Sequence, residues 1–320
     1  MVANLHILIN GWFWGQTNTG SGQYLHRLVE QLAQAPVTTT FTLLIPESRD
    51  GGTGNGKSAP RSPLPYLRSP ILPLPRQLAK LYWEQVTLPS AARRLGVDLL
   101  FVPYWAAPFW QPAPTVVTVH DLIPLLLPLY RGGLLNRLYT RLVSITAARA
   151  AAVITVSQAG AADVVTHLRI PPNRVTAIHH GPNGAVLANP NPATLAATRA
   201  QYDLPERYFL YLGGFDARKN VQGILAGYRR YVDRGGDPAV KLVLAGKLLG
   251  ADTPFFPDPE RMAAELGLTG QVCFVGWVDE ADKPFLYAGA TAYLFPSHYE
   301  GFGMMLLEAM AAGCPVITSR

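Results

Sequence analysis

The stretch TAYLFPSHYEGFGMMLLEAMAAGCPVITS, residues 291–319, decides the fold class. An apolar run ending at Phe295 predicts a strand, and a glycine-containing turn follows it. The run from Met304 to Ala312 predicts a helix that stops at Gly313, before a second strand. A strand, a helix and a further strand in this order form the unit from which parallel sheets are built. The stretch therefore predicts an α/β fold.

The same alternation extends over the rest of the chain. Before residue 179, strand-like runs alternate with helical patterns: strands at 5–10, 41–47, 98–104, 115–122 and 153–157, and helices at 22–35, 78–95 and 134–151. The proline-containing stretch HHGPNGAVLANPNPA interrupts the pattern and predicts a linker. The pattern then restarts, with strands at 208–214, 241–247 and 272–278 and helices at 222–235 and 259–268. We therefore expect two tandem Rossmann-like domains, 1–188 and 189–320.

Length and charge are consistent with this organisation. The 320 residues suffice for two domains with full cores, and the two cysteines predict neither a disulfide framework nor a zinc site. Residues 1–190 hold 15 Lys and Arg against 7 Asp and Glu, whereas residues 191–320 hold 12 against 14. The basic first half suggests an anionic partner, which would be nucleic acid, a phosphorylated substrate or a membrane surface; a solvated surface that is basic without a partner is the alternative. The sequence stops at Arg320 directly after a predicted strand, so we expect the second domain to be incomplete.

Two glycine-rich stretches are candidates for phosphate binding. GGTGNGKS, residues 51–58, matches the phosphate-loop pattern, but the following APRSPLP cannot begin the helix that this mechanism needs, so we interpret it as a chance match. In NTGSGQYL, Gly20, Ser21 and Gly22 open a helix. The dinucleotide fingerprint is weak there, because Leu25 replaces the third glycine. A helix N-terminus still suits an anion, and a plain flexible turn is the alternative.

Two further candidates follow strands. His120 ends the strand TVVTVH, where side chains of an open α/β sheet face the ligand crevice; a buried core histidine is the alternative. GGFDARKN follows the strand YFLYL, with Gly213 and Gly214 in the turn and Arg218 and Lys219 just before a helix. Because two cations oppose the dipole at a helix N-terminus, they favour binding of a diphosphate over helix stability. A solvated basic turn is the alternative.

The quoted stretch contains two acids, Glu300 and Glu308, eight positions apart. Eight residues of helix turn through about 80° beyond two full turns, so we expect the two acids to lie broadly on one side. Glu308 stands among Met, Leu and Ala, so its carboxylate needs donors, and the paired hydroxyls of a ribose would supply them. Glu300 would accept from sugar hydroxyls, while the amides after Gly301 would face phosphate oxygens. A solvated helix face is the alternative.

Taken together, these residues resemble family 4 glycosyltransferases, which are retaining enzymes of the GT-B fold that use nucleotide-diphosphate sugars. EGFGMMLLE resembles the family's E-x7-E motif, GGFDARKN its diphosphate-binding turn, VVTVHDLIP its histidine strand and NTGSGQYL its glycine loop; VITVSQAGAADV also fits. The form HDLIP together with RKN is similar to that of bacterial mannosyltransferases of polysaccharide assembly. The sequence departs from the family at HHGPN, where many relatives have NGVD, and at Gly214, where some carry Arg.

The resemblance implies a role for each candidate residue. His120, Arg218, Lys219 and Glu300 would be the catalytic residues. The donor-binding set would be Gly20, Ser21, Gly22, Gly213, Gly214, Gly301, Phe302, Gly303 and Glu308. The donor would be a nucleotide sugar, GDP-mannose favoured, with no further cofactor and no metal; Asp258 and Glu260 are interpreted as loop charges. A nucleotide-sugar epimerase or phosphorylase of the same fold, or a non-catalytic binding module, remains the alternative.

The resemblance also implies where the protein works. The acceptor would be a glycan or a lipid-linked glycan, nucleic acid is not expected as a partner, and the location would be the cytoplasm at the inner face of the membrane. The segment YLRSPILPLPRQLAKLYWEQ mixes Arg68, Arg76 and Lys80 with Tyr82 and Trp83, a mixture that suits an anionic lipid surface. An ordinary amphipathic helix is the alternative.

Overall fold

The structure is a computed structural model that describes residues 4–17, 19–47, 61–181, 191–250 and 252–319. The chain divides into two compact units, Met1–His179 and His180–Arg320. The domain boundary expected between residues 188 and 189 and the stretch GGTGNGKS both lie outside the described residues.

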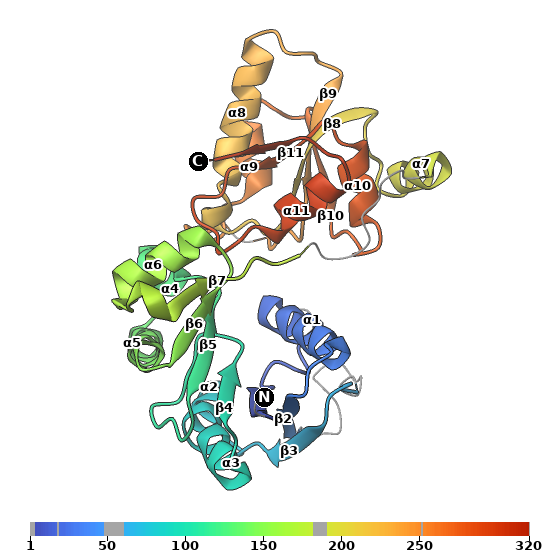
Figure 1. Cartoon of the computed structure of the whole chain (residues 1–320). Coiled ribbons are helices and arrows are strands. Elements are labelled where there is room, and N and C mark those ends of the chain that lie inside the picture. The colour runs from blue at the N-terminus through green and yellow to red at the C-terminus, as the bar shows by residue number, and fades with distance from the viewer. Residues whose placement is uncertain (1–3, 18, 48–60, 182–190, 251, 320) are drawn as a thin grey trace. The chain divides into compact units, whose positions relative to one another are not determined.

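Unit 1 is built on a parallel sheet. Its described strands are β1 (His6–Asn10), β2 (Thr40–Glu47), β3 (Tyr66–Pro70), β4 (Leu99–Val102), β5 (Thr115–Val119), β6 (Ala152–Thr155) and β7 (Val175–Ala177), in the spatial order β3-β2-β1-β4-β5-β6-β7. Its helices are α1 (Gly20–Gln34), α2 (Arg76–Tyr82), α3 (Leu88–Leu95), α4 (Ile123–Leu126), α5 (Leu134–Ala148) and α6 (Gln158–Leu168). Helix α1 packs on one face of the sheet, whereas α2, α3, α5 and α6 pack on the other (Figure 1).

Unit 2 repeats this plan. Its described strands are β8 (Arg207–Leu212), β9 (Val240–Ala245), β10 (Val272–Gly276), β11 (Ala292–Phe295) and β12 (Val316–Thr318), all parallel, in the order β10-β9-β8-β11-β12. Its helices are α7 (Pro192–Gln201), α8 (Val221–Asp233), α9 (Pro259–Glu265), α10 (Lys283–Gly289) and α11 (Met304–Ala311). Helices α8 and α9 cover one face of the sheet, and α10 and α11 cover the other (Figure 1). The predicted α/β class with two Rossmann-like domains is confirmed.

The helix predicted over residues 78–95 differs from the expectation. It is interrupted by a π-helical turn, Trp83–Thr87, between α2 and α3. Pro89 lies within the first turn of α3 and lacks an amide donor, and in a regular helix its ring would collide with the carbonyl four residues earlier. The wider turn accommodates the proline. It also directs Trp83 and Glu84 inward, since both are buried.

Candidate active site

The sheet of unit 2 reverses its winding between β8 and β11, which are neighbours in space although β9 and β10 separate them in sequence. At such a switch point the loops after the two strands diverge and leave a crevice at the carboxyl edge of the sheet. Gly213 follows β8 directly, and Glu300 lies in the loop after β11. The two motifs that the sequence singled out therefore meet at the switch point of unit 2.

A three-residue ion-pair cluster occupies this position. Glu300 Oε2 lies 2.6 Å from Arg218 Nη1, and Glu300 Oε1 lies 2.6 Å from Lys219 Nζ. The side chains are 13%, 11% and 20% exposed for Arg218, Lys219 and Glu300, so the cluster lies below the surface but is not sealed. Asp216 Oδ1 is 3.5 Å from Arg218 Nε. A guanidinium beside an ammonium is a combination that binds phosphate oxygens through charge-assisted hydrogen bonds, so the cluster is chemically suited to an anion.

The turn that carries both cations is fastened to the loop after β11. Residues Ala217–Lys219 form a 3-10 turn, and Asn220 follows with φ 56° as the N-cap of α8, its side chain accepting from the Gly223 amide at 3.1 Å. Asn220 Nδ2 also donates to the Pro296 carbonyl at 3.0 Å. The sequence placed Asn220 at the helix start but missed this second bond. Asparagine is one of the few residues that adopt the left-handed conformation, so an asparagine directly before a predicted helix is the sequence signal that could have revealed this bond.

Arg218 makes two further contacts with the same loop. Its Nη1 donates to the Tyr299 carbonyl at 3.0 Å, and its own carbonyl accepts from the His298 amide at 2.8 Å. Backbone groups of the loop after β11 therefore fix both the guanidinium and the main chain of Arg218, which orients this side chain toward Glu300.

The glycines after β8 allow a close approach of backbones. A Cβ at Gly246, the residue after β9, would lie 2.0 Å from the Gly213 carbonyl oxygen, so this position requires glycine. The Tyr211 hydroxyl donates to the Gly214 carbonyl. The structure thus places Gly213 and Gly214 in a tightly packed turn next to the cation cluster. Gly246 is a supporting residue that sequence reasoning missed.

The glycine turn predicted between the two acids is present, and it corrects the expectation that both acids lie on one side of a helix. Gly303 has φ 89°, a conformation that favours glycine, and α11 begins only at Met304. Glu300 therefore lies outside the helix, and the two acids do not share one helical face. Phe302 packs edge-on against His180, with ring centroids 5.1 Å apart. Gly301, Phe302 and Gly303 connect the ion-pair cluster to the N-terminus of α11.

Glu308 is only partly buried, and its carboxylate has a donor in the protein. The Tyr287 hydroxyl donates to Glu308 Oε2 at 3.3 Å. Burial raises the pKa of Glu308, an effect opposed by the charge of Lys283 and reinforced by Glu280. The expected need for a donor was correct, and Tyr287 on α10 meets part of it.

In unit 1, His120 directly follows β5. Its Nε2 lies 3.1 Å from the Pro103 carbonyl oxygen, which can only accept, so Nε2 carries the proton of the neutral ring. The Tyr24 ring packs edge-on at 4.7 Å between centroids. Burial lowers the pKa of His120, and the bond to Pro103 opposes this shift. The imidazole is therefore neutral near pH 7.

The glycine loop forms the first turn of α1. Thr19 is the N-cap, and its side chain accepts from the Gly22 amide at 3.1 Å. A Cβ at Gly22 would lie 1.9 Å from the Gln16 carbonyl oxygen, so this position requires glycine, whereas Gly20 has open space around it. Gly20 and Ser21 are thus the first residues of the helix, and the Gly22 amide is already engaged by the cap.

The switch point of unit 1 lies between β1 and β4, and a buried polar network fills it. Asn10 Nδ2 donates to the Tyr104 hydroxyl at 2.8 Å, and Asn10 Oδ1 accepts from Trp83 Nε1 at 2.9 Å. The fully buried Glu84 pairs with Lys80 and accepts from the Tyr139 hydroxyl at 2.9 Å. Sequence reasoning missed this network, three members of which, Lys80, Trp83 and Glu84, lie in the segment for which it considered a lipid surface.

That assignment is wrong for two residues. Trp83 is a core residue, and Lys80 is held by Glu84 and by the rings of Phe13, Tyr104 and Tyr139.

Asp258 is the N-cap of α9 and accepts from the Glu260 amide at 2.9 Å. Among the described residues there is no cluster of three or more His, Cys, Asp or Glu suited to a metal ion.

Comparison with known proteins gives two family matches. Residues 18–183 match the model described as Glycosyltransferase Family 4, and residues 196–320 match that of Glycosyl transferases group 1. The chain is 28% identical over 206 residues to O-antigen chain mannosyltransferase B of Escherichia coli, covering 64% of this chain and 52% of the relative. It is 30% identical over 225 residues to the serotype-specific mannosyltransferase WbdA of Escherichia coli, covering 65% and 26%. The chain thus spans about half of the first relative and a quarter of the second.

Solved structures agree on the fold. The Anabaena protein HepE in complex with UDP-glucose matches with a TM-score of 0.67 and 20% identity, covering 98% of this chain and 80% of that one. Sucrose-phosphate synthase from Thermosynechococcus elongatus matches with a TM-score of 0.67 and 22% identity, covering 98% and 81%. These likenesses establish the predicted GT-B fold.

Proposed function

Because the chain belongs to glycosyltransferase family 4, we propose that it is a retaining glycosyltransferase that moves a hexose from a nucleotide-diphosphate sugar to a glycan or lipid-linked acceptor. The observation that carries the proposal is Glu300 held between Arg218 and Lys219 at the switch point of unit 2. A carboxylate suits sugar hydroxyls, and two adjacent cations suit a diphosphate.

In this assignment unit 2 holds the nucleotide sugar. Arg218 and Lys219 bind the diphosphate, and Glu300, whose two oxygens have lone pairs beyond those facing the cations, accepts from the hydroxyls of the transferred sugar. Gly213, Gly214 and the turn of Gly301, Phe302 and Gly303 let the backbone approach the donor closely. Glu308 accepts from the ribose hydroxyls, with Tyr287 holding one carboxylate oxygen.

The chemical step needs little acid–base help from the protein. The acceptor oxygen attacks the anomeric carbon on the face from which the phosphate departs, the bond from that carbon to the phosphate oxygen breaks, and the acceptor proton passes to the leaving phosphate. Arg218 and Lys219 stabilise the charge that develops on that phosphate. The neutral His120 and the loop of Gly20, Ser21 and Gly22 belong to unit 1, where they would face the reacting sugar and the phosphates.

Mannose is the favoured sugar, and GDP-mannose the favoured donor, because both Escherichia coli relatives above are mannosyltransferases. The first of them is an O-antigen chain mannosyltransferase, which also supports a polysaccharide acceptor. A lipid-linked acceptor would place the protein in the cytoplasm, in contact with the inner face of the membrane. No helix among the described residues is long and apolar enough to span a bilayer.

A thermal-shift screen against GDP, UDP and ADP and their sugars tests the proposal. We expect the largest shift with GDP-mannose, and we expect Arg218→Ala to reduce it while Arg234→Ala, an exposed arginine elsewhere in unit 2, does not. Incubation with the best donor and octyl α-mannoside then separates the alternatives. Transfer supports the proposal, conversion of the free donor to another sugar indicates an epimerase, and binding without turnover indicates a binding module.

A further inference from the structure

The segment that contains α5 has an unusual charge pattern. No aspartate or glutamate occurs between Asp121 and Asp163, whereas the same interval contains four arginines: Arg131, Arg137, Arg141 and Arg149. Much of the +8 balance of the first 190 residues therefore comes from one continuous stretch. A surface formed by this stretch is basic without any compensating acid.

The solvent side of α5 is apolar where a surface helix is normally polar. At about 100° per residue, Leu134, Leu138, Arg141 and Ile145 fall within a stripe about 60° wide. The buried residues Val143, Thr146 and Ala147 lie on the opposite side. Helix α5 thus has one apolar face for the core and a second that faces solvent, whereas an amphipathic surface helix has only the first.

The exposure of these leucines is high. Leu134 is 72% exposed, Leu135 73% and Leu138 54%, and Ile145 is also exposed. Single exposed apolar residues are common, but a contiguous group on one helix marks an interaction site. Arg137 and Arg141 stand among these residues and are exposed. We name Leu134, Leu135, Arg137, Leu138, Arg141 and Ile145 the α5 face.

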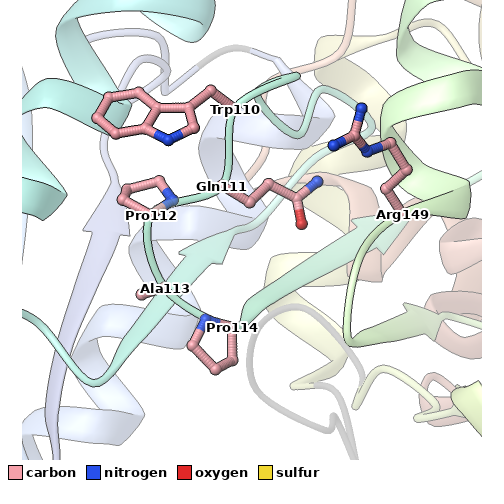
Figure 2. A pocket seen from close by; sticks show the side chains of 6 residues that line it. All are labelled: Trp110, Gln111, Pro112, Ala113, Pro114 and Arg149. Atoms are coloured by element: carbon pink, nitrogen blue, oxygen red, sulfur yellow. The ribbon is translucent and has the colours of Figure 1, made fainter.

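The surface continues past the C-terminal end of α5 onto the loop before β5. The Arg149 guanidinium lies 4.3 Å from the ring centroid of the exposed Phe109, and Arg93 lies 5.7 Å from that of the exposed Trp110. Gln111 Nε2 donates to the Thr146 carbonyl at 3.1 Å and so fixes this loop to the helix. Figure 2 shows Trp110 and Arg149 on either side of the hollow that they line with residues 111–114.

We propose that the α5 face, together with Phe109 and Trp110, is a docking surface for an anionic lipid membrane. Exposed leucines can enter the acyl boundary, arginines suit lipid phosphates, and Trp and Phe at the margin suit the headgroup region. The absence of acids favours lipid over a protein partner, whose recognition normally uses charges of both signs. The proposal identifies the surface with which the protein would bind the membrane that contains a lipid-linked acceptor, and in that sense it rests on the proposed function. Membrane binding itself requires no catalysis.

This assignment moves the expected contact away from residues 66–85. Five basic and aromatic residues of that segment were expected to contact lipid. Trp83 is buried and Lys80 pairs with Glu84, so these two cannot do so. Arg76, a third, donates a hydrogen bond to the Gln16 side chain at 2.5 Å. Residues 122–162, which contain the α5 face, include no carboxylate, whereas residues 66–85 supply Glu84 beside Lys80.

Co-sedimentation with vesicles tests the proposal. The chain is mixed with phosphatidylcholine vesicles and with vesicles containing phosphatidylglycerol, at low and high salt. We expect binding only with phosphatidylglycerol, and we expect it to weaken at high salt because screening shortens to about 3 Å at 1 M. Arg137→Gln/Arg141→Gln should lower the partition coefficient about thirtyfold, since each basic residue near such a surface contributes about fivefold.

Matched variants make the test specific. Leu134→Gln/Leu135→Gln/Leu138→Gln should abolish binding while leaving nucleotide affinity unchanged, so failure here is distinguishable from failure of the proposed function. Arg230→Gln/Arg234→Gln, which removes the same charge from exposed positions of unit 2, should bind as the parent does. Parent-like binding by both α5 variants would overturn the proposal. So would a dimer that forms through the α5 leucines without any lipid binding, as measured by sedimentation velocity.

Discussion

The two units have the same kind of switch point but fill it differently. In unit 1, between β1 and β4, Glu84 is fully buried and is enclosed by Lys80, Tyr104 and Tyr139. In unit 2, between β8 and β11, Glu300 pairs with Arg218 and Lys219 and stays 20% exposed. Both carboxylates have cationic partners, so pairing alone does not distinguish a structural cluster from a ligand site. The exposure of the carboxylate to solvent distinguishes them.

The energetics of the two clusters follow from this difference. Burial raises the pKa of Glu84, and the charge and hydrogen bond of Lys80 oppose the shift. A carboxylate removed from water in this way is maintained only while every donor around it stays in place. The cluster of Glu300 keeps contact with water, so its charges can exchange water for ligand oxygens at lower cost. We infer that the first cluster holds the segment of α2 and α3 in place, while the second binds.

Lys219→Ala should produce the largest effect on catalysis. If Lys219 faces the leaving phosphate, as proposed, its removal should lower kcat by about 10²–10³, with a smaller change in KM, because charge on that phosphate grows in the transition state. Steady-state kinetics of nucleotide release from the best donor measures this split. Arg234→Ala is the control. A change in KM alone would mean that Lys219 binds only the ground state.

Lys80→Met should affect stability and leave binding intact. The substitution leaves the fully buried carboxylate of Glu84 without its cation, which should cost about 3 kcal/mol in the free energy of unfolding near pH 7. Denaturant unfolding measures the loss. Lys80→Met/Glu84→Gln should recover part of it, because the uncompensated charge is gone. If Lys80→Met weakened nucleotide binding without a loss of stability, the distinction between the two switch points would fail.

The Glu300 cluster could be predicted from the sequence and the buried Glu84 cluster could not, for a physical reason. Glu300 follows a strand and precedes a glycine turn, and Arg218 and Lys219 oppose a helix dipole, so all three stand out from their local pattern. Glu84 lies within a helical pattern where a polar residue is expected on the solvent side. The π turn that directs it inward arises from tertiary packing and from Pro89, which periodicity does not register.

Fold prediction failed where strands or helices are short or peripheral. Strand β3 is a mostly exposed edge strand that ends at Pro70, so it has neither the apolar run nor the composition of a buried strand. Strand β7 has three residues, and α10 has only seven, with Pro284 in its first turn, so neither gives a clear periodic pattern. The central strands of the sheets, such as β8 and β9, are mostly apolar and were predicted correctly. Because helices cover both faces of the sheet, nearly every residue of a central strand is buried and therefore apolar.

Glu308→Ala should have a moderate effect on binding. If Glu308 accepts from two ribose hydroxyls, the loss of that acceptor should weaken nucleotide affinity about tenfold. Isothermal calorimetry with the nucleoside diphosphate measures it. Glu280→Ala is the matched control, because Glu280 is an exposed neighbour on the same side of unit 2 and is not assigned to the site. Equal affinity in Glu308→Ala and the parent would remove the ribose assignment.

Glu308→Gln should have the smallest effect, and its sign depends on pH. Burial raises the pKa of Glu308 above its usual value of 4.5, so the folded state holds this proton more tightly than the unfolded state does. The parent and the variant should therefore have the same free energy of unfolding below pH 4.5. As pH rises through 4.5 towards the folded pKa, ionisation favours the unfolded parent, and the variant should become the more stable by less than about 1 kcal/mol, because the side chain is only partly buried. Urea unfolding from pH 4 to pH 7 measures the difference, with the exposed Glu206→Gln as the control. A variant less stable than the parent at pH 7 would show that the ionised Glu308 carboxylate stabilises the fold, and would contradict the effect expected from its burial.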